Sequence, residues 1–237
     1  MTPDLVQTLV LGITWYVIFL FSITLHEAGH ALAARLLGDP TAYEGGQVTL
    51  NPLPHIKREP WGMVAIPLYS YFSWHWMMGW ASAPYDPVWA FRHPRRAAVM
   101  AAAGPAGNLL LVLIAGAAIR IGMAQGALLA PDRVSFSAVT AAAGPGGAAA
   151  VVTPLSIFFS LNLILFVFNL LPLPPLDGSA ILPIFMSDDM ARRYSDFLHQ
   201  PMLPLLGILV AWLLFDRVYS PVQTLALHLL YPGVGYH

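Results

Sequence analysis

A five-residue motif, His26-Glu27-Ala28-Gly29-His30, combines two imidazoles and a carboxylate at a spacing that suits metal-dependent hydrolysis. On an α-helix, side chains four positions apart lie about 40° apart around the axis, so both imidazoles can face one ion with Glu27 beside them. Among random sequences of this length and composition, roughly three in a thousand would contain H-E-x-x-H. The motif therefore indicates a metal site rather than a chance arrangement.

The composition places this motif in a membrane protein. Hydrophobic residues make up 57% of the chain and charged residues only 10%, compared with about 25% charged in soluble globular domains. We expect one membrane domain over residues 1–237, with no separate soluble domain, and the net charge of -1 gives no reason to expect nucleic acid. The absence of cysteine leaves histidine and carboxylates as the strong metal ligands.

The motif lies at the end of the first apolar stretch. Residues 5–25 contain no charge and are long enough, at about 1.5 Å per residue, to cross a hydrocarbon core of about 30 Å. We expect the helix to continue through the motif to Leu37 and to stop at Gly38-Asp39-Pro40. Ionisable groups in a spanning helix cost about 2.5 to 3.5 kcal/mol each on insertion scales and usually face a cavity, a partner or an ion.

The remaining apolar stretches predict an all-α polytopic membrane protein with about four to six membrane segments. Clear spans are expected at residues 97–119 and 151–173. Residues 202–230 are interrupted by Asp216-Arg217, which predicts a short span followed by an interfacial helix, or two half-spans. Residues 122–150 are rich in alanine and glycine and are expected to form a flexible loop.

Two smaller features follow the first span. Residues 45–52 alternate polar and apolar side chains between turn-forming residues, which predicts a short strand or a β-hairpin. Residues 61–83 are apolar and aromatic, but they contain Pro67, His75 and Gly79 and could form either a full span or a re-entrant element.

The distribution of basic residues favours re-entry. Cytoplasmic loops collect Lys and Arg near the ends of spans, and the basic loop residues can share one side only if residues 61–83 dip into the membrane and return. These residues are Lys57, Arg58, Arg92, Arg95, Arg96, Arg192 and Arg193. The same arrangement brings Asp177 to the depth of His26 and His30.

Asp177 is the best candidate for a third metal ligand. Catalytic zinc usually has three protein ligands and an open fourth position, so two imidazoles need one further donor. Asp177 adjoins a predicted span, in a proline-rich stretch that could line a cavity. The alternative is an ordinary turn aspartate before Gly178. For His55, a hydrogen-bonding or packing role is preferred to that of a fourth ligand.

This constellation predicts peptide-bond hydrolysis without a covalent intermediate. Zinc lowers the pKa of a bound water towards about 7, so Glu27 could take the proton, let hydroxide attack a carbonyl and protonate the leaving amine. Glu27 could instead be a direct ligand, although the two histidines at the correct spacing are better placed for that role.

Four blocks in the chain make it resemble the site-2 proteases, a family of intramembrane zinc metalloproteases. The first is the His26 to His30 motif, and the last runs from Asn169 through Asp177 to Gly178. The two middle blocks are Gly46-Gln47-Val48-Thr49-Leu50-Asn51-Pro52-Leu53-Pro54-His55-Ile56 and Gly104-Pro105-Ala106-Gly107-Asn108. Together they cover roughly residues 20–182.

The resemblance implies roles for individual residues. His26, His30 and Asp177 correspond to the ligands of one Zn²⁺ per chain and Glu27 to the general base, while Asn169 matches an asparagine that steadies the tetrahedral intermediate. It also implies that residues 45–50 form an edge strand and that residues 61–83 re-enter the membrane. An edge strand could pair with an unwound substrate helix.

Some features depart from the family pattern. Lys57 stands where similar sequences often carry Asp, which puts any role of that position in doubt. We expect neither an inserted PDZ domain nor an appended nucleotide-sensing domain.

We therefore expect a zinc endopeptidase of the cell membrane, with its active site toward the cytoplasm, that cuts a transmembrane segment of another protein in the lipid bilayer. The substrate is expected to be a single-pass helix. The alternative is a metal transporter or a metal-dependent scaffold with the same ligands, against which Glu27 argues because a scaffold needs no base there. The sequence specifies neither the substrate nor the oligomeric state.

Overall fold

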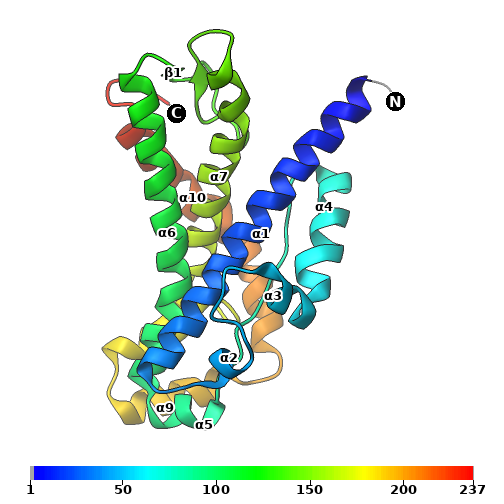
Figure 1. The fold of residues 1–237 in the computed structure, drawn as a ribbon. Helices are drawn as coiled ribbons and strands as arrows, with labels where there is room; N and C mark the ends of the chain where they lie inside the picture. Colours follow the sequence, from blue (N-terminus) through cyan, green and yellow to red (C-terminus); the bar gives the residue numbers. More distant parts are fainter. Residues whose placement is uncertain (1–2, 237) are drawn as a thin grey trace. The chain divides into compact units, whose positions relative to one another are not determined.

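The computed structural model describes residues 3–236 and is mainly helical (Figure 1). Its helical elements, in chain order, are α1 (Pro3–Leu37), α2 (Thr41–Glu44), α3 (Pro52–Arg58), η1 (Trp61–Ala65), α4 (Ile66–Trp74), α5 (Pro87–Arg92), α6 (Pro94–Ala124), α7 (Gly147–Asn169), α8 (Asp177–Ile181), η2 (Leu182–Phe185), α9 (Asp188–Leu198) and α10 (Leu203–Leu230). Two short strands, β1 (Leu128–Leu129) and β2 (Ala141–Ala142), form an antiparallel pair.

Four of the described helices, α1, α6, α7 and α10, are long and apolar enough to cross a bilayer. They contain 23 to 35 residues, and at about 1.5 Å per residue even the shortest exceeds a hydrocarbon core of about 30 Å. Many of their large apolar side chains are not covered by protein, as expected for helices in contact with lipid. The predicted fold class, an all-α polytopic membrane protein, is confirmed.

The chain forms two compact units. The first contains the chain up to Thr24, Leu50–Ser82 and Leu111–Asn162, and the second contains Leu25–Thr49, Ala83–Leu110 and the chain from Leu163 onward. Helices α1, α6 and α7 each contribute residues to both units, so neither unit is one continuous stretch of sequence. The single domain expected for residues 1–237 stays a prediction.

In the first unit, residues 61–83 double back on themselves. Helices η1 and α4 together contain 14 residues, which amounts to about 21 Å and is too short for a full span. His75 then takes a left-handed conformation, with φ of 61°, and the chain returns until the Trp80 N–H donates to the Gly62 carbonyl at 3.1 Å. This geometry is not that of a full span and is the one expected for the re-entrant alternative.

Hydrogen bonds attach this re-entrant element to α1. The Tyr71 hydroxyl donates to the Thr8 carbonyl at 2.7 Å, and the Tyr16 hydroxyl donates to the Met63 carbonyl at 3.2 Å. Thr8 precedes Tyr16 whereas Tyr71 follows Met63, so α1 and α4 run antiparallel.

A buried amide joins α7 to α1 in the same unit. The Asn162 side chain is fully buried, and its Nδ2 donates to Ser22 Oγ at 2.9 Å and to the Phe158 carbonyl at 2.8 Å. Pairing of this kind satisfies a polar group that would otherwise be unsatisfied in hydrocarbon.

The strand predicted for residues 45–52 was wrong. This stretch contains no strand in the structure, because Gly46 takes a φ of 70° and the Gln47 N–H bonds back to the Ala42 carbonyl at 2.9 Å. These contacts close a turn after α2 instead of starting a ladder. The small hairpin of this protein is formed by β1 and β2, inside residues 122–150, which were expected to be a flexible loop.

The break predicted in the last apolar stretch was also wrong. Helix α10 runs without interruption through Asp216 and Arg217, both of which are exposed. Charged residues lower mean hydropathy without disturbing the helical backbone, and Pro221 is accommodated within the same helix. By contrast, α1 ends at Leu37 as predicted, and Gly38 follows it with a φ of 106°.

We expect Gly62→Ala to destabilise the re-entrant element. A Cβ at Gly62 would collide with the Trp80 backbone carbonyl and with the Trp80 ring, and overpacking of this kind costs about 1 to 3 kcal/mol. Thermal unfolding in detergent should show a lower midpoint. Gly144→Ala is the matched control, because nothing lies within 4 Å of its Cβ position, and equal midpoints for the two variants would contradict the close approach.

Candidate active site

Three side chains of the second unit place their potential metal-binding atoms close to one another. His26 and His30 lie one turn apart on α1, and their Nε2 atoms are 3.0 Å from each other. Asp177, the first residue of α8, places Oδ2 3.0 Å from His26 Nε2 and 3.4 Å from His30 Nε2. Among the described residues, this group could hold a metal ion, with its ligand atoms all within 4.8 Å of one another.

The other nitrogen of each imidazole is held by α6. His30 Nδ1 lies 2.8 Å from the Met100 carbonyl oxygen, which can only accept, so this nitrogen carries the hydrogen. His26 Nδ1 lies 2.6 Å from Asn108 Oδ1, which is also an acceptor. A neutral imidazole with its hydrogen on Nδ1 has a lone pair on Nε2. Both rings therefore direct lone pairs toward the space beside Asp177.

This donor set fits a bound cation. Asp177 Oδ2 is buried and receives no hydrogen bond, and the two Nε2 atoms that face it are acceptors as well. Lone pairs this close to one another repel unless a positive charge lies between them. Two imidazoles and one carboxylate form a donor set that catalytic zinc sites use.

A glycine on α6 makes room for the two imidazoles. A Cβ at Gly104 would collide with the Nε2 atoms of both His26 and His30. Gly29 on α1 in turn makes room for the backbone of α6, because a Cβ at Gly29 would lie 3.0 Å from the Ala103 carbonyl oxygen. Two glycines on facing helices thus permit the close approach of α1 and α6 at the site.

A proline-rich turn delivers Asp177. Helix α7 ends at Asn169 rather than continuing to residue 173, since Pro172 and the prolines that follow cannot continue a regular helix. Gly178 packs directly on the carbonyl oxygens of Leu170 and Leu171, where a side chain would not fit. This contact holds the start of α8 against the end of the turn.

Helix α10 packs against the same proline-rich turn. Gly207 lies directly against the Pro174 backbone, and Ala211 packs in a buried cluster with Leu171 and Leu176. These contacts place α10 behind the turn that carries Asp177.

The two residues predicted to act on substrate lie on α1, which carries the two histidines, and at the end of α7. Glu27 follows His26 on α1 and is 5% exposed. Asn169 is the last residue of α7, and its Nδ2 donates to the Leu165 carbonyl at 3.0 Å. Their catalytic roles stay predictions. His55 is buried in α3 of the first unit and is not a member of the three-residue group.

The sequence did not predict the partners of the imidazoles. Asn108 belongs to one of the four blocks of the family resemblance, but nothing in the sequence identified His26 as its partner. The feature that could have identified Asn108 as a partner is its amide side chain in an otherwise apolar span, within Gly104-Pro105-Ala106-Gly107-Asn108. The Met100 contact uses a backbone carbonyl, which leaves no trace in the residue types.

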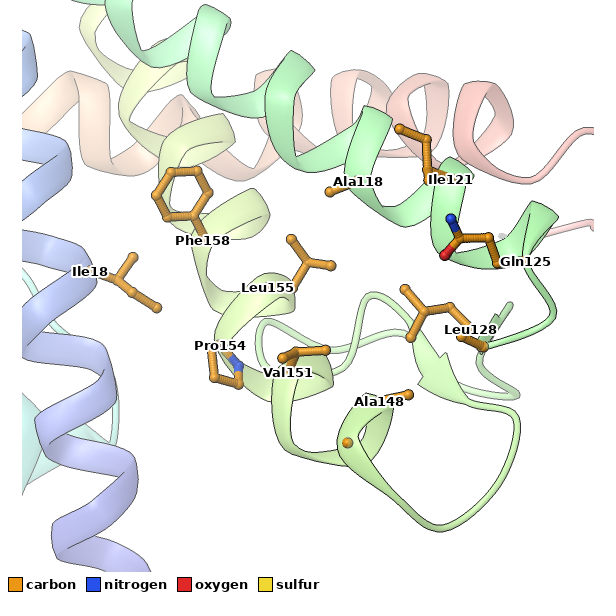
Figure 2. A pocket seen from close by; sticks show the side chains of 13 residues that line it. Ile18, Ala118, Ile121, Gln125, Leu128, Ala148, Val151, Pro154, Leu155 and Phe158 are labelled. Carbon is orange, nitrogen blue, oxygen red and sulfur yellow. The ribbon is translucent and has the colours of Figure 1, made fainter.

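The first unit contains an open apolar groove of about 800 Å³ (Figure 2). Ile18, Val151, Leu155 and Phe158 are among its lining residues, and Gln125 lies toward the end of α6. The side chains that line it include no ionisable group. The groove therefore offers a surface for apolar molecules and no acid, base or nucleophile.

The fold and the site define a polytopic membrane protein with a candidate metal centre carried by a spanning helix. The model of Peptidase family M50 matches residues 14–213, and the chain belongs to this family. It is thus an integral membrane protein of this peptidase family.

Two relatives are each named "Putative zinc metalloprotease". YwhC of Bacillus subtilis (strain 168) is 37% identical over 166 residues, which cover 68% of this chain and 64% of the relative. Rip2 of Mycobacterium tuberculosis (strain ATCC 35801 / TMC 107 / Erdman) is 32% identical over 175 residues, which cover 73% of this chain and 58% of the relative. The chain thus spans about three fifths of the length of these relatives. No solved structure matches it.

We expect Gly104→Ala to weaken metal binding about tenfold or more, because the new methyl group would displace both imidazoles and such displacements cost metal sites 10- to 100-fold in affinity. Zinc affinity, measured by competition with a chelator, tests this. Gly107→Ala is a matched control three residues further along α6, since its Cβ would meet the flexible end of Leu25. Equal zinc affinities in the two variants would argue against the role of Gly104.

Proposed function

We propose that this protein is an intramembrane zinc endopeptidase that hydrolyses peptide bonds within or near the transmembrane segments of other membrane proteins. The proposed ligands of its single zinc ion are His26, His30 and Asp177. The observation that carries the proposal is the convergence of three lone-pair atoms beside Glu27, on a helix that is apolar enough to cross a bilayer. The names of the relatives support the same chemistry.

A zinc ion, when bound, acidifies a water molecule and polarises a carbonyl group. Glu27 accepts the proton of the attacking water and passes it to the leaving amine nitrogen. Its place next to His26 on α1 keeps the carboxylate beside the ligands, and its burial excludes bulk water from competing for the proton.

Asn169 is proposed to stabilise the negative charge that develops on the substrate carbonyl oxygen. Its amide has two N–H donors, and one of them is engaged by the Leu165 carbonyl. This bond fixes the orientation of the side chain and leaves the second donor for substrate. A preoriented donor of this kind costs no reorganisation during the reaction.

The substrate is proposed to be a single-pass helix that reaches the site from the bilayer. A helix in hydrocarbon has all its peptide groups bonded internally, so it must be locally unwound before a carbonyl can be attacked. The comparisons give no support to the alternative of metal transport, and a transporter has no need of the base supplied by Glu27.

The site is proposed to lie toward the cytoplasmic side of the cell membrane. Arg92, Arg95, Arg96, Arg192 and Arg193 all belong to the second unit, which also contains the ligands. Arg95 Nε lies 3.6 Å from Asp188 Oδ1, and the Arg192 guanidinium lies over the Phe91 ring. These contacts gather α5, α6 and α9 into one basic region, which is typical of a cytoplasmic face.

The roles of base and ligand can be separated by substitution. We expect Glu27→Gln to keep stoichiometric zinc while cleavage falls by about 10²- to 10⁴-fold, the usual contribution of a general base. His26→Ala and Asp177→Ala should lose both zinc and cleavage. Purified variants are compared for zinc content and for cleavage of a model transmembrane helix in proteoliposomes.

A transport assay in the same vesicles separates the two functions. Zinc flux without cleavage by the wild-type protein would overturn the proposal, as would full zinc content in a His26→Ala/Asp177→Ala double variant.

The orientation can be tested with single cysteines, because the natural chain contains none. Asp196 on α9 and Asp132 in the loop between α6 and α7 are both exposed. With the site toward the cytoplasm, a membrane-impermeant maleimide should label Asp132→Cys in intact cells but label Asp196→Cys only after lysis. The opposite pattern would invert the proposed orientation.

A further inference from the structure

Helix α6 holds the two imidazoles through two different kinds of hydrogen-bond acceptor, one from the backbone and one from a side chain. His30 is held by the Met100 backbone carbonyl, which remains whatever side chain stands at position 100. His26 is held by the side chain of Asn108 at 2.6 Å, between residues that are 5% and 0% exposed. This contact therefore depends on the identity of one residue.

We propose that Asn108 is a positioning residue that fixes the tautomer and the orientation of the His26 ring. The inference rests on the proposed metal site, because His26 can bind a cation through Nε2 only if its hydrogen is on Nδ1. Asn108 Oδ1 accepts that hydrogen, so Nε2 keeps its lone pair toward Asp177 and His30. With no acceptor at position 108, the Nδ1 hydrogen would be buried without a partner, and the Nε2 hydrogen tautomer would become competitive.

The chemistry of the Asn108 side chain matters as well as its position. The partner of a metal-bound imidazole is often a carboxylate, which raises the basicity of the ligand. The partner of His26 is instead a neutral amide. The carboxylates beside the imidazoles are therefore those of Glu27, which belongs to the motif, and of Asp177, which the proline-rich turn places there. An amide positions His26 without adding a third negative charge to a site in apolar surroundings, where an extra buried charge is costly.

The geometry of α6 explains how one helix serves both rings. Met100 and Asn108 are eight residues apart, or about two turns, and Gly104 lies midway between them at the point where the imidazoles approach the helix. The bulk of the rings thus occupies the space over Gly104, while their Nδ1 atoms reach the turns on either side.

The test compares Asn108→Leu, Asn108→Asp and Asn162→Leu in the purified full chain. Asn108→Leu removes the acceptor at similar volume, and we expect its zinc affinity, measured by chelator competition, to fall 10- to 100-fold. Asn108→Asp keeps an acceptor oxygen, so its zinc affinity should lie within a few-fold of wild type, while its additional buried charge should lower the midpoint of thermal unfolding. Asn162→Leu removes another fully buried amide, one bonded to Ser22, and should leave the affinity within about threefold.

Spectroscopy provides a readout that loss of stability does not mimic. In zinc-loaded protein labelled with ¹⁵N-histidine, the Nδ1 protons of His26 and His30 should both appear as strongly hydrogen-bonded signals. In Asn108→Leu the His26 signal should move upfield or vanish, while the His30 signal, held by Met100, stays in place. In the wild-type protein, the His26 signal is identified by its nuclear Overhauser contact with the Asn108 side-chain amide.

Each outcome decides the matter. The inference is overturned if wild-type His26 lacks the Nδ1 proton, which is measurable even if Asn108→Leu does not fold. It is equally overturned if Asn108→Leu binds zinc as wild type does, or if Asn162→Leu loses as much affinity. In those cases loss of cleavage in Glu27→Gln would still support the proposed function, so the two can fail separately.

Discussion

The site depends on one constraint, which is that two imidazoles on α1 must present lone pairs to the same small volume. Two acceptors placed 3.0 Å apart repel each other, so something must hold the rings from behind. Helix α6 does so with one carbonyl and one amide oxygen, and Gly104 gives the rings the space to approach. The fit of the two imidazoles and Asp177 to a cation depends on this arrangement.

The elements around the site are arranged in successive layers of support. Helix α1 carries the histidines, the proline-rich turn carries Asp177, and α10 packs behind that turn through Gly207 and Ala211. Glycine occurs where backbones touch, at positions 29, 178 and 207, and where the imidazoles meet α6, at position 104. Small residues suit a protein in lipid, where helix association depends on close van der Waals packing rather than on the hydrophobic effect.

Local features of this fold could be predicted from the sequence, whereas pairings between distant segments could not. The spacing of His26 and His30 is a property of one helix, and the placement of basic residues was enough to bring Asp177 to their face. The bond between His26 and Asn108 joins residues 82 positions apart and depends on how closely two helices approach. The alternation of polar and apolar residues at 45–52 predicted a strand, but such a pattern does not reveal whether a partner strand exists. Asp216 predicted a break in the last helix, but hydropathy does not measure the hydrogen bonding of the backbone.

The re-entrant element has a consequence for the backbone at its tip. Its helical arm is about 21 Å long, with tryptophans near its ends at positions 61 and 74, whereas the hydrocarbon layer is about 30 Å thick. An arm that enters hydrocarbon and turns back places non-helical backbone there, which is stable only where protein or water bonds it. The Met78 and Trp80 N–H groups donate to Ser70 Oγ and to the Gly62 carbonyl, so the return segment obtains from its own arm part of the bonding that water supplies elsewhere.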